Sequence, residues 1–246
     1  MTVRDILQYI DRIAPFATAE EWDNPGLLVG SSNQEVSRIL VALDATAGAL
    51  EAAKAMGAEL IITHHPVIFA PLRQLDGNGL PYRLAADGIA LVAAHTNLDK
   101  ADGGVNDTLA ACLGLADVTI ATDGMTRIGV LPEAEDATAF ARRVAAALDT
   151  PVRVCGNRPV RTVAVCGGSG GDFIPALVGQ VDAFVTGEVK HHQWLEANGA
   201  DLTLVEAGHY ATEVPVVDTL CQQLQEAFPT LPIIPYRDGN PYITVK

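Results

Sequence analysis

Short, continuous apolar runs alternate with helical segments along almost the whole chain, and this alternation limits the possible folds more than any other feature. In the first half, the runs stand in SRILVALDA, ELIITHH and IALVAAH, with helical periodicity before and between them. Runs that are apolar throughout are typical of strands covered on both faces. We therefore predict an α/β fold class, with mixed, largely parallel sheets flanked by helices.

A polar stretch, VTIATDGMTR, separates two such alternating series and suggests two α/β domains. We place them at residues 1–122 and 123–246, with an approximate boundary that leaves room for interleaving. The second series is predicted to contain helices over 136–147 and 212–226. Its last predicted segments are PIIPY and YITVK.

The charge of the chain limits the binding partners that we expect, and its cysteines indicate the cellular compartment. The chain has 246 residues and a formal net charge of −14, which repels nucleic acid phosphates and anionic membranes but suits metal cations. The four cysteines form no C-x-x-C pair, as expected for reduced core thiols. The first segment reads as an amphipathic helix and not as a signal peptide. We expect a cytoplasmic protein that binds neither nucleic acid nor membrane.

Two adjacent histidines, His64 and His65, follow a predicted buried strand and precede Pro66. Beyond the strand end both rings can turn to the same side, and imidazole is the commonest transition-metal ligand. The alternative is that one histidine caps backbone groups and the other faces solvent. His95 ends the next strand and Asp99 follows on a predicted loop, which favours metal binding over helix capping by Asp99 because Asn106 and Asp107 stand closer to the next helix.

A similar pattern recurs in the second half, where ANGADLTLVEAGH resembles AMGAELIITHH. It places His209 at another strand end, where open α/β sheets gather their ligands. Glu213 stands four residues later, at the opening of the predicted helix, where it is either a ligand or a favourable charge at the helix N-terminus. Three histidines and two carboxylates exceed the needs of one tetrahedral site and suit two metals that share a carboxylate. We therefore expect a metal site in the cleft between the two domains.

Three further motifs have two readings each. CGGSGGDF lacks the lysine of a phosphate-binding P-loop and reads as a tight turn that could line an anionic-substrate pocket. The segment with Glu188, Lys190, His191 and His192 supplies either cavity groups or a polar first helical turn. WDNPGLLVG reads as structural, with Asp23 and Asn24 in a turn, although Asn24 could reach the cleft.

Taken together, WDNPGLLVG, ITHHP, HTNLDKADGGVND, GGSGGDF, TGEVKHH and GHYATE resemble the signatures of the NIF-three-like dinuclear metal-centre proteins, also called GTP cyclohydrolase I type 2 homologues. The resemblance covers nearly the whole chain. It implies two divalent metal ions (zinc, iron, manganese or nickel), a bridging role for Glu213, a toroidal homohexamer, and a full ligand set of His64, His65, Asp99, His209 and Glu213.

The resemblance also implies a function, with two hypotheses. One is a metal-dependent hydrolase, GTP cyclohydrolase-like, in which metal-activated water attacks an electrophilic carbon and a nucleotide is a possible substrate. Its catalytic candidates beside the ligands are His95, Glu188 and His192. The alternative is a metal-binding, metal-delivery or regulatory interaction protein without a substrate. A weaker third hypothesis is a phosphoesterase. The lack of an evident basic cluster argues against a triphosphate substrate.

Overall fold

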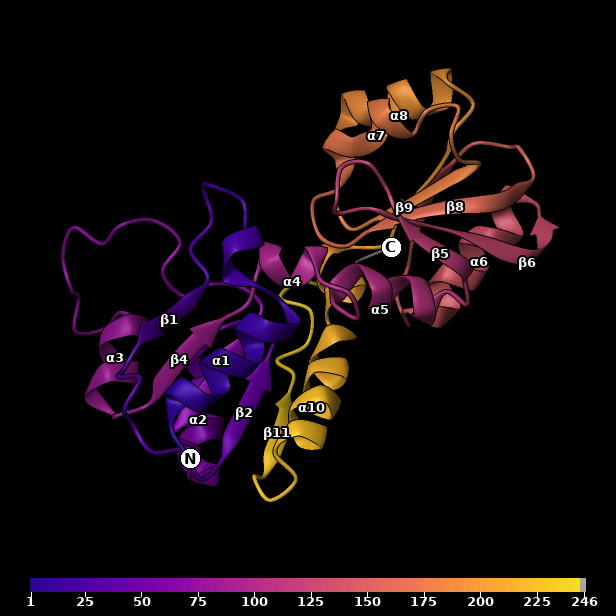
Figure 1. Cartoon of the computed structure of the whole chain (residues 1–246). Coiled ribbons are helices and arrows are strands. Elements are labelled where there is room, and N and C mark those ends of the chain that lie inside the picture. The colour runs from indigo at the N-terminus through magenta and orange to yellow at the C-terminus, as the bar shows by residue number, and fades with distance from the viewer. Residues whose placement is uncertain (244–246) are drawn as a thin grey trace. The chain divides into compact units, whose positions relative to one another are not determined.

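The computed structural model describes residues 1–243 and contains two compact units (Figure 1). The first unit comprises Met1–Gly104 and Val216–Lys246, and the second comprises Val105–Pro215. The predicted division at residue 122 therefore falls inside the second unit. The end of the chain belongs to the first unit because strand β11 (Ile233–Tyr236) pairs in parallel with β2 (Ile39–Ala42).

The first unit has a five-stranded sheet of order β1-β4-β3-β2-β11. All neighbouring strands are parallel except β1, which runs antiparallel to β4 at one edge. The remaining strands are β1 (Gly26–Val29), β3 (Leu60–Thr63) and β4 (Ala90–Ala93). The helices are α1 (Val3–Ile13), the 3-10 helix η1 (Phe16–Thr18), α2 (Ala47–Met56), α3 (Leu80–Ala86), α4 (Thr96–Lys100) and α10 (Val216–Ala227).

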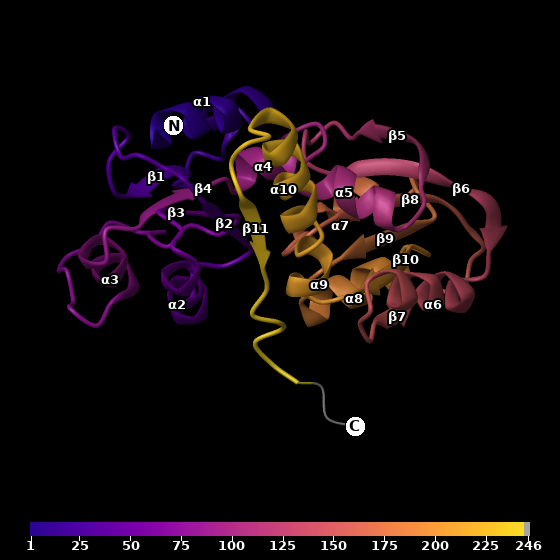
Figure 2. The same ribbon diagram turned by 90° about the horizontal axis from the view of Figure 1, so that it is seen from below.

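Every residue of β2, β3 and β4 is buried, as the uniformly apolar runs predict. Alternate side chains face opposite sides of the sheet, so Leu40, Ile61 and Leu91 share a core cluster with α2 and α3. Figure 2 shows α1 and α10 on the other face of this sheet. The helices thus cover both faces and leave the carboxyl ends of β3 and β4 to carry polar groups.

The second unit has a six-stranded mixed sheet of order β5-β6-β8-β9-β10-β7. Strands β8, β9 and β10 are parallel, and the remaining pairings are antiparallel. The strands are β5 (Ala116–Ile120), β6 (Arg127–Glu135), β7 (Arg153–Cys155), β8 (Val160–Cys166), β9 (Ala183–Thr186) and β10 (Thr203–Glu206). The helices are α5 (Val105–Cys112), α6 (Ala137–Ala147), the 3-10 helix η2 (Gly171–Phe173), α7 (Ile174–Leu177), α8 (His191–Gly199) and α9 (His209–Glu213).

The core of this unit has two layers, because successive side chains of a strand point to opposite faces of the sheet. Val163 and Val165 of β8 pack with α5 and α6, whereas Ala164 and Cys166 pack with α7 and α8. Figure 1 shows these two helix pairs on opposite faces of the sheet. The α/β fold class with helix-flanked mixed sheets is confirmed.

Three local predictions differ from the structure. The helix predicted over 212–226 is two helices, α9 and α10, separated at Pro215, which has no N–H to donate. The polar stretch predicted to separate the domains begins inside β5, an edge strand whose residues are all exposed. Of the predicted final segment, Tyr242 and Ile243 lie in no strand, and residues 244–246 are outside the described part of the chain. Among residues 1–243, every helix is too short or too polar to cross a bilayer.

Candidate metal centre

The carboxyl end of β3 positions the two adjacent histidines of the first unit. The backbone N–H groups of His64 and His65 both donate to the carbonyl of Leu43, at 3.1 and 3.0 Å. The Thr63 hydroxyl donates to the His65 carbonyl at 2.8 Å. The chain is therefore fixed just beyond the strand, and the two imidazole rings lie with their centroids 4.8 Å apart.

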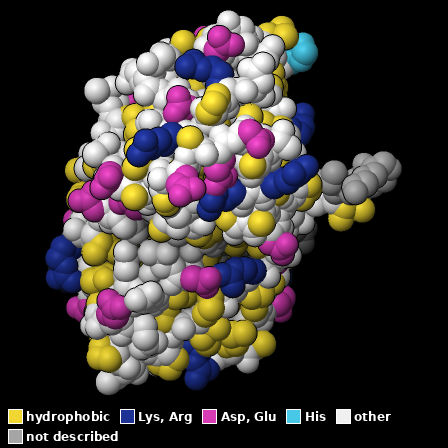
Figure 3. Space-filling model, turned by 90° about the vertical axis from the view of Figure 1, so that its right-hand side faces the viewer, with side chains coloured by type: hydrophobic (Ala, Val, Ile, Leu, Met, Phe, Trp, Pro, Cys, Tyr) yellow, Lys and Arg dark blue, Asp and Glu magenta, His cyan; other side chains and the backbone are white. Residues whose placement is uncertain are grey.

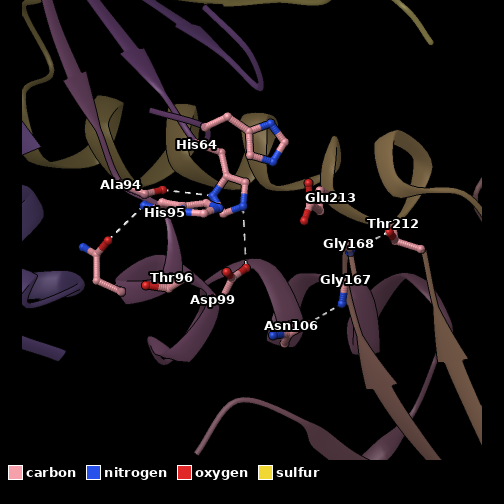
Figure 4. A network of polar contacts seen from close by, with 12 residues as sticks. His64, Ala94, His95, Thr96, Asp99, Asn106, Gly167, Gly168, Thr212 and Glu213 are labelled. Carbon is pink, nitrogen blue, oxygen red and sulfur yellow. Dashed lines mark hydrogen bonds and ion pairs between the residues drawn. The ribbon is translucent and has the colours of Figure 1, made fainter. Parts of the chain in front are cut away.

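Each of three histidine rings has its Nδ1 atom at an oxygen acceptor. His64 Nδ1 lies 2.9 Å from the Ala94 carbonyl, as Figure 4 shows. His65 Nδ1 lies 2.7 Å from Asp44 Oδ1, and His95 Nδ1 lies 2.8 Å from Asp23 Oδ1. Carbonyl and carboxylate oxygens only accept, so Nδ1 carries the proton in each ring and Nε2 carries the lone pair. This orientation is typical of metal-binding imidazoles.

His64, His65 and His95 form a group able to hold a metal ion, since one ligand atom from each lies within 4.8 Å of the others. Burial lowers the pKa of His95, and the neighbouring His64 lowers it further, against the raising effect of Asp23. A lowered pKa keeps this imidazole neutral, which is the form that binds metals. The chemistry of the donor set therefore fits a transition metal.

Asp99 lies in helix α4 and not on the predicted loop. Its N–H donates to the His95 carbonyl at 3.0 Å, so the helix starts directly at the end of β4. The residue is buried, and Oδ1 lies 3.6 Å from His64 Nε2 (Figure 4). The structure thus brings Asp99 to the histidines of the first unit, as the sequence indicated, by a helical turn.

Asp23 is a site residue that sequence reasoning treated as part of a turn. Besides His95, its carboxylate accepts from the Thr96 N–H at 3.0 Å and from the Thr96 hydroxyl. Burial raises the pKa of Asp23, but these hydrogen bonds and the nearby His95 outweigh it, and the net pKa is lowered. Asp23 is thus an ionised carboxylate that orients His95. Asn24, proposed to reach a cleft, instead donates from Nδ2 to the Ile68 carbonyl at 2.6 Å.

In the second unit, His209 and Glu213 lie one turn apart in α9, with His209 Nε2 3.0 Å from Glu213 Oε2. His209 lies just beyond the end of β10, as predicted, and is the first residue of α9. Glu213 is the last residue of α9 and does not open the helix predicted over 212–226. The capping role considered for Glu213 is wrong, because the residue is buried at a helix C-terminus.

Glu188 lies beside His209, with Oε2 3.4 Å from His209 Nδ1. The Ser169 hydroxyl donates to the same carboxylate at 2.6 Å and lowers its pKa; burial opposes this effect, and His209 lowers the pKa further. Glu188 is therefore an ionised acceptor at Nδ1. The arrangement repeats in the second unit the pattern seen at the other three histidines.

The glycine-rich segment after β8 makes room for Glu213. Gly168 has φ +59°, and a Cβ atom there would lie 2.2 Å from Glu213 Oε1. The N–H of Gly167 donates to Asn106 and that of Gly168 to Thr212 (Figure 4). The N–H of Gly170 donates to Thr186. These donors are used within the protein, so the tight-turn reading holds and these three groups do not cradle a phosphate.

The other histidines of the second unit lie apart from this pattern. His191 and His192 are exposed in the first turn of α8, and Lys190 precedes them at its N-cap. Of the two interpretations given for this segment, the polar first helical turn therefore describes where His191 and His192 lie. A cavity of about 230 Å³ adjoins this turn and is lined mainly by polar residues, among them Ser169, Asp172, Glu188, Lys190 and Glu206.

The family is decided by a match over nearly the entire chain. The model of the Duf34/NIF3 (NGG1p interacting factor 3) family matches residues 1–241. The chain belongs to this family. The family resemblance seen in the sequence is therefore confirmed.

Curated relatives of this Duf34/NIF3 chain have one name in common. A protein of Streptomyces coelicolor named GTP cyclohydrolase 1 type 2 homolog is 36% identical over 242 residues, covering 90% of this chain and 85% of that protein. The protein of that name from Lactococcus lactis is 34% identical over 223 residues, covering 85% and 86%. GTP cyclohydrolase 1 type 2 of Helicobacter pylori is 31% identical over 221 residues, covering 86% of each.

Solved structures give the same fold. A hypothetical protein of Staphylococcus aureus has a TM-score of 0.94 at 28% identity, covering 100% of this chain and 99% of that one. Reduced HcgD from Methanocaldococcus jannaschii has a TM-score of 0.84 at 28% identity, covering 96% and 97%.

Proposed function

We propose that this protein is a metal-dependent hydrolase with two divalent metal ions per chain. Its ligands are His64, His65 and Asp99 from the first unit and His209 and Glu213 from the second, with Glu213 as the bridging carboxylate. The identity of the metal is open among zinc, iron, manganese and nickel, which all accept imidazole and carboxylate donors.

One observation carries this proposal: each Nδ1 atom of His64, His65 and His95 lies against an oxygen acceptor, at 2.7 to 2.9 Å. A single core histidine could satisfy one ring nitrogen in this way by chance. Here three neighbouring rings from two strand ends share the same Nδ1 contact, so Nε2 is the atom that His64 and His65 would offer to a metal and that His95 would offer to a proton. Such outer acceptors fix the tautomer and raise the basicity of the ligand.

Divalent ions in such a site act as Lewis acids and make water nucleophilic at neutral pH. Other residues of the protein hold and orient the histidine ligands. Asp44 holds His65, and Glu188 holds His209. His95, Glu188 and His192 are the candidates for proton transfer. His95 is suited to accept a proton because burial keeps it neutral, whereas Glu188, with a lowered pKa, is suited to remain a carboxylate.

The names of the relatives suggest GTP, and we propose hydrolysis at a ring carbon of a nucleotide-like substrate as the reaction class. The phosphates would need partners outside the glycine-rich turn, whose donors at Gly167, Gly168 and Gly170 are used internally. On the face shown in Figure 3, Lys and Arg side chains stand among Asp and Glu side chains. The internal use of the glycine-rich turn's donors favours recognition through the ring over recognition through a triphosphate.

We also propose a cytoplasmic homo-oligomer, with the toroidal hexamer implied by the family resemblance as its specific form. Light scattering coupled to size-exclusion chromatography measures the mass directly. A mass of one chain of 25.9 kDa would contradict this proposal.

The deciding experiment measures metal per chain by elemental analysis in protein purified without a metal-affinity tag, followed by GTP turnover under anaerobic conditions. Two ions with formate release support the cyclohydrolase-like function. Two ions without turnover of GTP or of other ring substrates support the non-enzymatic metal-binding or regulatory role. Glu213→Gln removes a ligand and is expected to lose at least one ion. Glu188→Gln weakens only the contact to His209 Nδ1 and removes no ligand, so the purified variant is expected to retain both ions. Retention of both by Glu213→Gln would show that the bridge is assigned wrongly.

A further inference from the structure

Two exposed aromatic side chains lie beside the histidine group of the first unit. Trp22 is 58% exposed and Phe69 is 53% exposed. Their ring centroids lie 5.7 Å apart, and the His95 ring contacts both edge to face, at 6.1 and 6.3 Å. We call Trp22 and Phe69 the aromatic pair.

The pair is built from two segments that are distant in sequence and tied to each other. Trp22 precedes Asp23, which is fixed to His95 and Thr96. Phe69 follows Ile68, whose carbonyl accepts from Asn24 Nδ2 at 2.6 Å. The turn before β1 and the loop after β3 are thus joined by a hydrogen bond two residues after Trp22 and directly before Phe69, so the segments that carry the two rings are already held together without a ligand.

Exposing two large aromatic rings side by side forfeits hydrophobic stabilisation that burial would provide. Flat aromatic faces near hydrogen-bonding groups are the surfaces on which planar heterocycles stack. Stacking requires no cation, which suits a chain of net charge −14.

We infer that the aromatic pair binds the planar heteroaromatic ring of the substrate and places it beside His95. Trp22 and Phe69 are therefore specificity-determining residues, and the ring is recognised without a contribution from phosphate. This inference rests on the proposed function for its substrate but can be tested independently of catalysis.

The test uses tryptophan fluorescence, because Trp22 and Trp194 are the two tryptophans of the chain. In a Trp194→Phe background, Trp22 alone reports. We expect saturable quenching by inosine and none by ribose 5-phosphate. Phe69→Ala in this background is expected to weaken inosine binding about tenfold or more, in line with stacking energies. Tyr82→Ala, which removes another exposed aromatic ring, is the matched control and is expected to leave inosine binding unchanged.

Absence of quenching by inosine, or equal binding by Phe69→Ala, would overturn the inference. Self-association that Phe69→Ala abolishes, without any inosine binding, would instead assign the pair to an interface between copies and would also overturn it. Metal content measured on the same samples separates this inference from the proposed function. Metal without inosine binding removes only the aromatic pair's role, and inosine binding without metal removes only the metal-dependent hydrolase.

Discussion

The oxygen acceptor at Nδ1 of each histidine determines that Nε2 is the ring nitrogen available to bind a metal. Asp44 makes this contact with His65 Nδ1 at 2.7 Å. Asp44→Asn removes the charge and leaves a weaker acceptor, so we expect metal affinity to fall by about 10- to 100-fold. Competition with a chelator measures the change. Asp87→Asn, at a carboxylate paired with Lys54, is expected to leave affinity unaltered. Equal affinity in wild type and Asp44→Asn would mean that the contact does not serve a metal.

Gly168 tests the space that the glycine-rich turn leaves for Glu213. In Gly168→Ala, the new Cβ atom would lie 2.2 Å from Glu213 Oε1 and would displace that carboxylate. We expect loss of metal together with destabilisation of about 1–3 kcal/mol from the left-handed backbone and the clash. Gly179→Ala is the matched control, since Gly179 also has positive φ but nothing within 4 Å of the added atom. Elemental analysis and thermal unfolding of both variants distinguish a lost ligand position from backbone strain alone.

At the scale of elements, the connection from α4 to α5 depends on Gly104. A Cβ atom at this position would lie 1.9 Å from the Leu98 carbonyl oxygen and 3.0 Å from that of Ala101. Both obstacles are backbone atoms, so Gly104→Ala is expected to destabilise the protein by about 1–3 kcal/mol. Gly199→Ala at the end of α8, with nothing within 4 Å, is expected to be neutral or stabilising. Chemical denaturation compares the two, and an unchanged midpoint for Gly104→Ala would refute the steric argument.

The starts of β2 and β3 are joined by Glu59. Burial raises the pKa of this carboxyl, but hydrogen bonds from Ser37 and from the Arg38 N–H outweigh burial and lower the net pKa. A lowered pKa stabilises the fold above the unfolded value of about 4.3, and this contribution is lost as pH falls through the folded-state pKa. Glu59→Gln should therefore cost about 1 kcal/mol at pH 7 and less at pH 3. Urea unfolding at both pH values measures this, and an equal cost at both would contradict it.

At the scale of the whole molecule, the second unit is continuous in sequence, whereas the first needs both ends of the chain. The second unit also has two core layers of its own. We expect the fragment 105–215 to unfold cooperatively by itself. The fragment 1–104 lacks α10 and β11, which leaves β2 without its parallel neighbour and Tyr9 without its contacts to Gln223 and Phe228, so we expect it not to fold. Circular dichroism during thermal unfolding tests both fragments, and cooperative unfolding of 1–104 would contradict the assignment.

The two similar sequence segments show which local features the sequence predicts reliably. In the first of the two similar segments, AMGAELIITHH, Gly57 has φ +67° and caps α2. The corresponding Gly199 is the last residue of α8 and has no left-handed conformation, whereas Asp201, two residues later, takes that conformation. The repeat in the sequence therefore preserves the helix, the strand and the following histidine, but not the turn chemistry. A sequence pattern predicts the type of an element better than it predicts the residue at which the element ends. The reason is that several residue types can adopt the same turn conformation.

The sequence by itself determined the α/β fold, since uniformly apolar strands that alternate with helical segments are typical of sheets covered by helices on both faces, and it placed the histidines of the predicted site at the carboxyl ends of strands. Only the tertiary structure decided which acceptor contacts the Nδ1 atom of each histidine. Asp23 and His95 are separated by 72 positions, and Asp44 and His65 by 21. No periodicity connects such pairs, because their contact depends on strand order in the sheet and on the path of loops. The same reason explains why β11 at the end of the chain pairs with β2 near its beginning.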